Sequence, residues 1–146
     1  MDDFLDATTP FVGTERTGWR DEALSRRHRM YGLNCPAVDI DFLMLEYDSG
    51  MPKALIEYKH ERAEETDLTH ASYQALRHLA VMGRIPFFVV RYTYEWRYTV
   101  IPACNLAETY VPVRVEMAED EFVELLYKVR GRVMPEDVRR WFGQTA

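Results

Sequence analysis

Cysteine is scarce in this chain, and long apolar runs are missing. The 146 residues include only Cys35 and Cys104, which lie far apart and form no C-x-x-C pair, so neither a disulfide framework nor a thiolate zinc site is expected. We expect both to be small buried apolar residues. No apolar stretch reaches the length of a membrane-spanning helix, and the opening MDDFLDATTP is acidic where a signal peptide would be basic. The sequence therefore predicts a soluble, cytoplasmic protein without a membrane partner.

A surplus of basic charge is also missing. The formal net charge is −6, which argues against a general nucleic-acid binder, because such proteins carry a basic footprint. The charges are uneven, however, and residues 26–29 read RRHR. Hydrophobic residues make up 47% of the chain, which excludes a disordered protein. Together with the length, this composition predicts a single folded domain over residues 1–146.

Helix and strand signals along the chain predict an α/β fold with a mixed central sheet. Residues 36–47 and 53–59 are rich in strand formers, and the turn residues of 48–52 join them into a β-hairpin. A helix at 68–82 and a strand at 85–92 follow, and a right-handed crossover makes that strand parallel to 53–59. The other expected elements are helices at 15–31, 118–130 and 135–142, strands at 95–103 and 111–117, a loose arm at 1–13 and a polar loop at 60–67.

Three of these elements carry more specific expectations. The apolar continuity of 36–47 predicts burial on both faces near its middle. In the helix at 68–82, spacings of three and four residues predict a core stripe, and Gly83 is expected to end the helix. In 95–103, alternating aromatics share one face, where they could stack bases, form a dimer face or pack under the helix at 118–130. The stripe consists of Leu68, Ala71, Ala75, Leu79 and Met82, and the aromatics are Tyr92, Tyr94, Trp96 and Tyr98.

Two pairs of charged side chains, each pair spaced two residues apart, lie on the strands of the predicted hairpin. Asp39 and Asp41 are two residues apart, so they point to one face of the outgoing strand. Glu57 and Lys59 likewise share a face of the return strand, and the turn makes Asp41 and Glu57 approximate cross-strand neighbours. Carboxylates among buried residues are costly unless a cation joins them, and Mg²⁺ or Mn²⁺ prefers oxygen ligands. The alternative is a salt bridge at a solvated strand end, but the apolar runs FLML and ALI beside these charges favour a buried metal site.

The residues VDIDFLML (38–45) and LIEYKH (55–60) resemble the two motif strands of the PD-(D/E)XK nuclease superfamily, the fold of type II restriction enzymes, archaeal Holliday-junction resolvases and VRR-NUC domains. The resemblance implies a restriction-endonuclease-like αβββαβ core with a mixed central sheet, followed here by extra C-terminal strands and helices. Residues 15–92 can cover that core, although one strand of its meander is less evident. The chain departs from the family's pattern by lacking a Pro-Asp dipeptide and by its acidic net charge.

The resemblance also implies a role for each matching residue of the hairpin. Asp41 would be the metal-binding aspartate, and Asp39 is the competing choice. Glu57 would be the second metal ligand, and Tyr58 would add its backbone carbonyl. Lys59 would be the catalytic lysine, which orients the attacking water and stabilises charge on the phosphate.

Helix residues add further candidates. Many relatives carry a glutamate on the first helix, where Glu22 stands, and resolvase-like relatives often carry a glutamine where Gln74 stands. The basic run would let Arg26, Arg27 and Arg29 contact phosphates and supply the local positive field that the net charge lacks. For each of these residues the alternative is an ordinary solvated position on a helix.

Together these residues predict a Mg²⁺-dependent (or Mn²⁺-dependent) endo- or exodeoxyribonuclease. Water activated by the metal would attack phosphorus in line and leave a 3′-hydroxyl and a 5′-phosphate, as the family implies. No separate recognition domain is evident, which favours a structure-selective or accessory nuclease acting on DNA. Dimerisation is common among such relatives, so a homodimer is an expected assembly. Two alternatives stay open: a catalytically inactive nuclease-fold protein that binds nucleic acid or protein, and an RNA-directed nuclease.

Overall fold

The computed structural model describes residues 22–31, 36–65 and 67–145. The contacts divide the chain after Val38 into two units, and each is described by itself. The first unit contains helix α2 (Glu22–Met30), so the predicted start of that helix, the arm at 1–13 and Cys35 lie outside the described residues. Within the described ranges no helix has the length and apolar character to cross a membrane.

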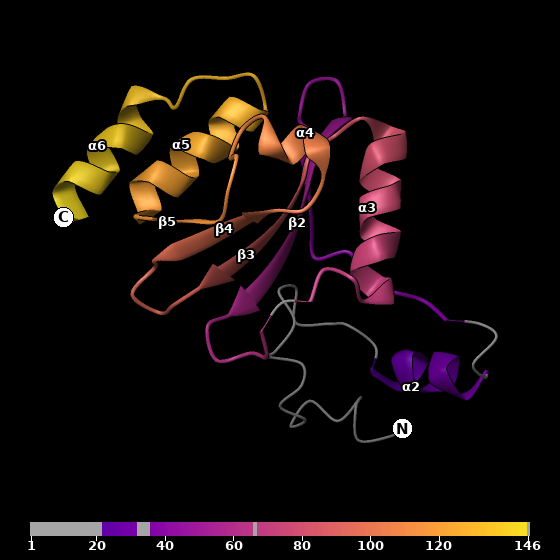
Figure 1. The fold of residues 1–146 in the computed structure, drawn as a ribbon. Helices are drawn as coiled ribbons and strands as arrows, with labels where there is room; N and C mark the ends of the chain where they lie inside the picture. Colours follow the sequence, from indigo (N-terminus) through magenta and orange to yellow (C-terminus); the bar gives the residue numbers. More distant parts are fainter. Residues whose placement is uncertain (1–21, 32–35, 66, 146) are drawn as a thin grey trace. The chain divides into compact units, whose positions relative to one another are not determined.

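The second unit contains β1 (Phe42–Glu46), β2 (Met51–His60), α3 (Ala71–Gly83), β3 (Phe87–Tyr92), β4 (Tyr98–Pro102), α4 (Asn105–Glu108), β5 (Val115–Met117), α5 (Glu119–Val129) and α6 (Glu136–Thr145) (Figure 1).

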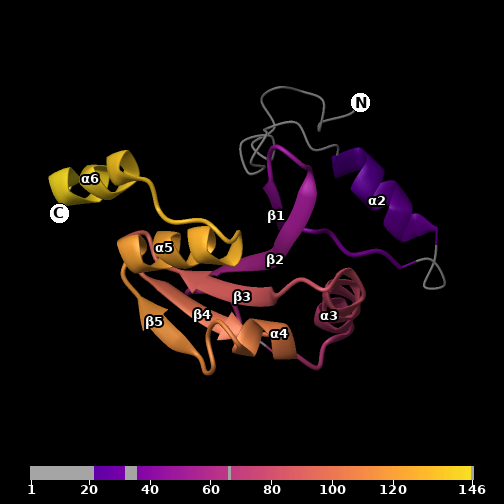
Figure 2. The same ribbon diagram turned by 90° about the horizontal axis from the view of Figure 1, so that it is seen from above.

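The second unit is built on a mixed five-stranded sheet with the order β1-β2-β3-β4-β5, which can be followed in Figure 2. The β2–β3 pair is parallel, as the crossover through α3 predicts, and the other three pairs are antiparallel. Because β2 and β3 are parallel, their carboxyl ends lie at the same edge of the sheet. The α/β fold with a mixed central sheet is therefore confirmed.

The predicted hairpin of β1 and β2 is present, with a tight turn between the strands. Gly50 adopts a left-handed backbone (φ 69°), which glycine tolerates without strain, and its N–H donates to the Glu46 carbonyl at 2.8 Å. The pairing slips between Met44 and Leu45, where a β-bulge changes the register. Beyond the bulge, Phe42 pairs with Ile56, so the next positions along the two chains are Asp41 and Glu57.

The expected burial of the first hairpin strand on both faces is wrong. Strand β1 lies at the edge of the sheet, and Phe42, Leu43 and Leu45 each keep at least 40% of their surface exposed. Only Met44 packs against the core. An apolar run alone does not distinguish a central strand from an edge strand, because both use the same residue types.

Helix α3 lies where expected, but a different stripe faces the core. Tyr73, Leu76 and Ala80 are buried, whereas Leu79 and Met82 of the predicted stripe are exposed. Both sets have helical spacing, and the packing of α3 on β2 and β3 decides which of them is buried. His70 caps the helix by accepting the Ser72 N–H, and the helix ends at Gly83 as predicted.

The predicted strand at 95–103 is shorter and begins with a turn. Tyr92 of β3 pairs with Tyr98 of β4, and residues 93–97 form the turn between them. Tyr94 and Trp96 therefore do not alternate along a strand. Tyr98 stacks on Phe122 of α5 at a centroid distance of 4.2 Å, so this aromatic does pack under the predicted C-terminal helix.

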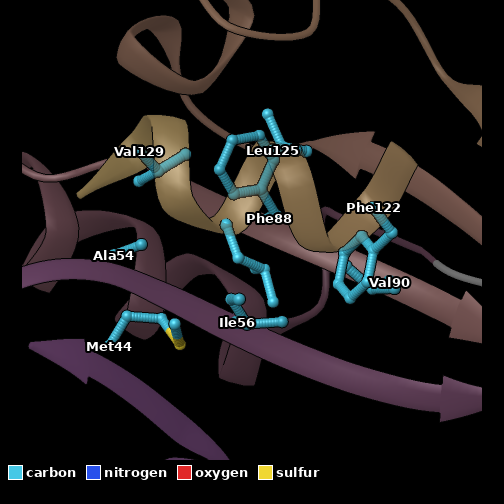
Figure 3. A pocket seen from close by; sticks show the side chains of 9 residues that line it. Met44, Ala54, Ile56, Phe88, Val90, Phe122, Leu125 and Val129 are labelled. Atoms are coloured by element: carbon cyan, nitrogen blue, oxygen red, sulfur yellow. The ribbon is translucent and has the colours of Figure 1, made fainter. Parts of the chain in front are cut away.

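Two helical layers cover opposite faces of the sheet (Figure 1). Successive residues of a strand point to opposite faces, so Leu55, Phe87 and Val89 face α3 while Ile56 and Phe88 face α5. On the α5 face, side chains of β1, β2, β3 and α5 surround a wholly apolar cavity of only about 10 Å³ (Figure 3). This seam is packed core and not a ligand site.

The C-terminal elements complete the unit. Strand β5 and helices α5 and α6 match the predicted elements, while α4 was not predicted. Cys104 is buried, as expected, and its thiol accepts the Phe87 N–H. Arg132, after α5, makes two hydrogen bonds to the Glu46 carboxylate at 2.7 and 3.1 Å, which joins the C-terminal part to β1.

Candidate active site

The predicted proximity of Asp41 and the E-x-K strand is confirmed by a hydrogen bond. The Tyr58 N–H donates to Oδ2 of Asp41 at 3.1 Å. Asp41 directly precedes β1. At this position the Tyr58 N–H therefore donates to a side-chain oxygen instead of to a backbone carbonyl of β1. This bond fixes the Asp41 carboxylate beside β2.

Glu57 and Lys59 project from the α3 face of β2, one residue on either side of Tyr58. Lys59 Nζ lies 3.7 Å from Oε2 of Glu57, which is an ion pair too long for a hydrogen bond. Only 16% of the Glu57 side chain is exposed, compared with 38% for Lys59. Burial raises the pKa of Glu57, the negative charge of Asp41 raises it further, and Lys59 opposes both. The site therefore holds two neighbouring carboxylates and one partly exposed ammonium.

One oxygen of Glu57 lacks a partner. Its Oε1 is buried and accepts no hydrogen bond from the described residues. A buried carboxylate oxygen without a donor costs free energy, on the order of 1–3 kcal/mol or more for a charged group. The ion pair of Lys59 with Oε2 leaves Oε1 available, and a cation ligand uses such an oxygen.

Tyr73 of α3 joins the site, which the sequence interpretation missed. Burial raises the pKa of its hydroxyl, and the charges that act on it belong to Lys59, Glu57, Arg91 and Asp41. The hydroxyl is therefore within electrostatic reach of the charged groups of the site. Because Tyr73 shares a helical stripe with buried residues, its sequence signal is that of a core aromatic, and only the packing of α3 on β2 reveals its place.

Arg91 of β3 was also given no role, and it lies beside Lys59 in the sheet. The two residues are in register in the parallel pair, so their side chains share the α3 face. The Arg91 guanidinium is buried and donates to three backbone carbonyls of the loop after β2, at 2.7–2.9 Å. These acceptors are the carbonyls of Glu61, Ala63 and Glu64. Arg91 thus holds the loop that follows the E-x-K strand.

The remaining predicted residues are distributed over both units. Asp39 is exposed in the segment before β1. Gln74 is half-buried on α3, next to Tyr73. Arg26 and Arg27 are exposed on α2, which belongs to the separately described first unit. Glu22 and Arg29 are on the same helix, and their side chains lie outside the described residues.

The donor set suits a small divalent cation. In an extended strand the N–H and C=O of one residue point to the same side, so the Tyr58 carbonyl points toward Asp41, as its N–H does. In the described part of the chain no three His, Cys, Asp or Glu side chains gather at a common point, so Asp39 does not join Asp41 and Glu57. Mg²⁺ is usually held by one or two carboxylates, with water and substrate phosphate as its other ligands. Two carboxylates and one carbonyl therefore fit Mg²⁺ or Mn²⁺.

Comparisons with known proteins add no relative: no family model, no curated protein and no solved structure matches this chain. The site is therefore interpreted from its own geometry.

Proposed function

We propose that the chain is a metal-dependent nuclease that hydrolyses DNA phosphodiester bonds. The observation that carries this proposal is the group formed by Asp41, Glu57 and Lys59, in which Oε1 of Glu57 is buried and accepts no hydrogen bond from the described residues. A divalent cation bound to that oxygen would offset the cost of burying it. The ammonium of Lys59 beside it would attract an anionic substrate such as a phosphodiester.

The proposal also assigns the fold to the restriction-endonuclease-like group. In support, β1, β2, α3 and β3 follow one another in the order of the last four elements of the αβββαβ core, and β2 and β3 are parallel. The described residues contain one strand fewer before α3 than that core.

Each residue of the site has a distinct task in the proposed reaction. Asp41, held by the Tyr58 N–H, and Glu57 would bind the cation, together with the Tyr58 carbonyl. When bound, such a cation lowers the pKa of water and neutralises charge on phosphate oxygens. Lys59 is more exposed than Glu57, and its ammonium would orient a phosphate oxygen or the attacking water.

The reaction is the hydrolysis of one P–O bond. Water adds its oxygen to phosphorus, the bond from phosphorus to the 3′-oxygen breaks, and a proton passes to that oxygen. The products are a 5′-phosphate and a 3′-hydroxyl. No redox partner or further co-substrate is needed.

A cleavage assay with matched lysine variants tests this proposal. Labelled single-stranded, duplex, flapped and four-way-junction DNA, with matched RNA strands, is incubated with wild-type protein in Mg²⁺, Mn²⁺ or EDTA. Cleavage is expected only with metal, and Lys59→Ala should reduce its rate by about 100-fold or more.

Lys53→Ala is the control, because Lys53 lies on the same strand six residues before Lys59, roughly 20 Å away along β2. Its rate should equal that of the wild type. Equal cleavage by wild type and Lys59→Ala contradicts the assignment of the site. Faster cleavage of RNA than of DNA keeps the site and changes the substrate.

A second candidate is a nuclease-fold protein that binds without cutting. Two observations favour it: the net charge of −6, and the lack of a third metal-ligating side chain among the described residues. This candidate predicts no metal-dependent cleavage of any strand in the panel, and it predicts that Asp41→Asn leaves nucleic-acid binding unchanged.

A further inference from the structure

Four aromatic side chains form a cluster where β2 and β3 end. The aromatic cluster consists of His60, Tyr92, Tyr94 and Trp96. The His60 and Tyr94 rings lie 4.3 Å apart, and Tyr92 and Trp96 are nearly parallel (14°) at 6.2 Å. His60 Nδ1 accepts the Arg62 N–H at 3.2 Å, which holds its ring in place. The cluster is therefore ordered by its own contacts.

Two members of this cluster remain open to solvent. Tyr94 keeps 65% of its surface exposed and Trp96 keeps 46%. Trp96 also adopts a left-handed backbone (φ 60°), a conformation that glycine would adopt without strain. Its N–H donates to the Thr93 carbonyl at 2.9 Å, so the turn holds this conformation. The chain thus displays a large exposed ring at a position where the turn itself favours a smaller residue.

The cluster is adjacent to the candidate active site along the strand. His60 directly follows Lys59, and in the parallel register Lys59 pairs with Arg91 while His60 pairs with Tyr92. Lys59 points to the α3 face and His60 to the α5 face, and His60 is the last residue of β2. A polymer that passes around this end of the sheet can touch both.

The chemistry of the cluster favours an unpaired base as its occupant. Exposed aromatic rings stack on bases whatever the sequence, and each stacked base contributes appreciably to affinity. With a net charge of −6, phosphate contacts alone cannot supply strong binding. In an intact duplex the faces of the bases are covered by their neighbours, so a single strand or a splayed end presents what this cluster can bind.

We propose that the aromatic cluster stacks unpaired bases of the nucleic acid whose backbone reaches Lys59, so that the substrate is single-stranded or splayed. This inference rests on the proposed function for the identity of the substrate. It makes two claims beyond that function: the preference for unpaired strands, and the dependence of binding on Trp96 and Tyr94.

Fluorescence anisotropy in EDTA tests the inference without cleavage. A labelled oligonucleotide is titrated with protein, as a single strand and as a blunt duplex. Wild-type protein should bind the single strand at least about tenfold more tightly, and Trp96→Gly and Tyr94→Ala should each weaken that binding by about tenfold. Trp96→Gly suits the left-handed backbone, so its melting temperature checks that the fold is retained. Trp141→Ala, which removes an exposed indole of α6, should bind like the wild type.

The outcomes separate this inference from the proposed function. Equal affinity for single strand and duplex, unchanged binding by folded Trp96→Gly, or no binding at all would overturn the inference. If Lys59→Ala abolishes cleavage while Trp96→Gly binds normally, the nuclease stands and the stacking surface does not. If binding depends on the cluster and no strand is cut in Mg²⁺ or Mn²⁺, the stacking surface stands and the nuclease does not.

Discussion

The two faces of β2 differ in chemistry although one run of ten residues supplies both. On the α5 face, Ala54 and Ile56 are buried, and the Tyr58 ring makes an edge contact with Phe122 at 6.2 Å. On the α3 face, Leu55 is buried, but Glu57 and Lys59 follow it toward the end of the strand.

This difference separates residues that stabilise the fold from residues that belong to the candidate active site. The α5 face is apolar and close-packed, and burial of that surface favours folding. The α3 face carries two neighbouring carboxylates and a buried oxygen without a donor, which oppose folding. Proteins commonly accept such unfavourable groups where a site must bind or react. The predictions below test this separation.

The largest expected effect is on stability, from the α5 face. Phe88 is 2% exposed and lines the apolar seam beneath α5. Phe88→Ala should lower the free energy of unfolding by about 3–5 kcal/mol, because it leaves a cavity in a packed core. Urea denaturation measures the change, and Val113→Ala at a 70% exposed position should cost less than about 0.5 kcal/mol. A loss below about 1 kcal/mol for Phe88→Ala would show that the seam is not the core described here.

A smaller effect is expected from Arg91, which lies on the charged face but serves the fold. Arg91→Met removes three donors from loop carbonyls and should cost about 2–3 kcal/mol. The loop at 61–65 should then exchange its amide hydrogens faster than the same loop does in the wild type. Arg91→Lys keeps the charge and should recover only part of the stability, since one ammonium cannot reproduce the planar guanidinium. Unchanged exchange in Arg91→Met would show that the loop is held by other contacts.

Removal of the Glu57 charge should stabilise the protein when no metal is present. Burial and the charge of Asp41 raise the Glu57 pKa, so stability falls as the pH rises from the unfolded-state value toward the folded-state value. Glu57→Gln should therefore melt about 2–4 °C higher than the wild type in EDTA near neutral pH, which is roughly 1 kcal/mol for a chain of this size. Below the unfolded-state pKa the carboxyl is protonated in both the folded and the unfolded state. The difference in melting temperature between Glu57→Gln and the wild type should then disappear.

Differential scanning calorimetry at several pH values measures both parts of this prediction. Glu124→Gln serves as the control, because Glu124 is an exposed acid paired with Arg139. It should not raise the melting temperature. A lower melting temperature for Glu57→Gln would mean that the Glu57–Lys59 ion pair is structural.

The smallest effect concerns Glu46, an acid that favours folding. Hydrogen bonds from Arg132, supported by the charges of Arg132 and Arg130, hold the pKa of Glu46 below its usual value. Its contribution to stability is therefore present above the unfolded-state pKa and is lost as the pH falls through the folded-state value. Glu46→Gln should flatten the acid limb of the stability curve, as followed by circular dichroism. An unchanged acid limb would remove Glu46 from this account.

Much of the fold follows from local sequence signals. The hairpin turn, the helix that ends at Gly83 and the parallel partner of β2 were predicted from turn residues, helical spacing and crossover handedness, and the structure contains them. The exposure of β1 and the buried stripe of α3 were not, because strand order and the choice between two helical faces depend on tertiary packing.

The candidate site was only partly predictable. Asp41, Glu57 and Lys59 lie at positions that strand periodicity and the hairpin register fix, so the sequence brings them together. Tyr73 and Arg91 join them from elements whose facing residues the sequence does not reveal. Their signals, a helical aromatic and a strand arginine, are those of ordinary core and surface residues.

Calorimetric titration with Mn²⁺ tests the central claim most directly, namely that Asp41 and Glu57 bind a divalent cation. Wild-type protein should bind Mn²⁺, and Asp41→Asn and Glu57→Gln should each weaken that binding by at least about tenfold. Glu116→Gln, which changes an exposed acid on β5, should bind like the wild type. If Asp41→Asn and Glu57→Gln bind Mn²⁺ as tightly as the wild type, or if the wild type does not bind Mn²⁺, the account is contradicted.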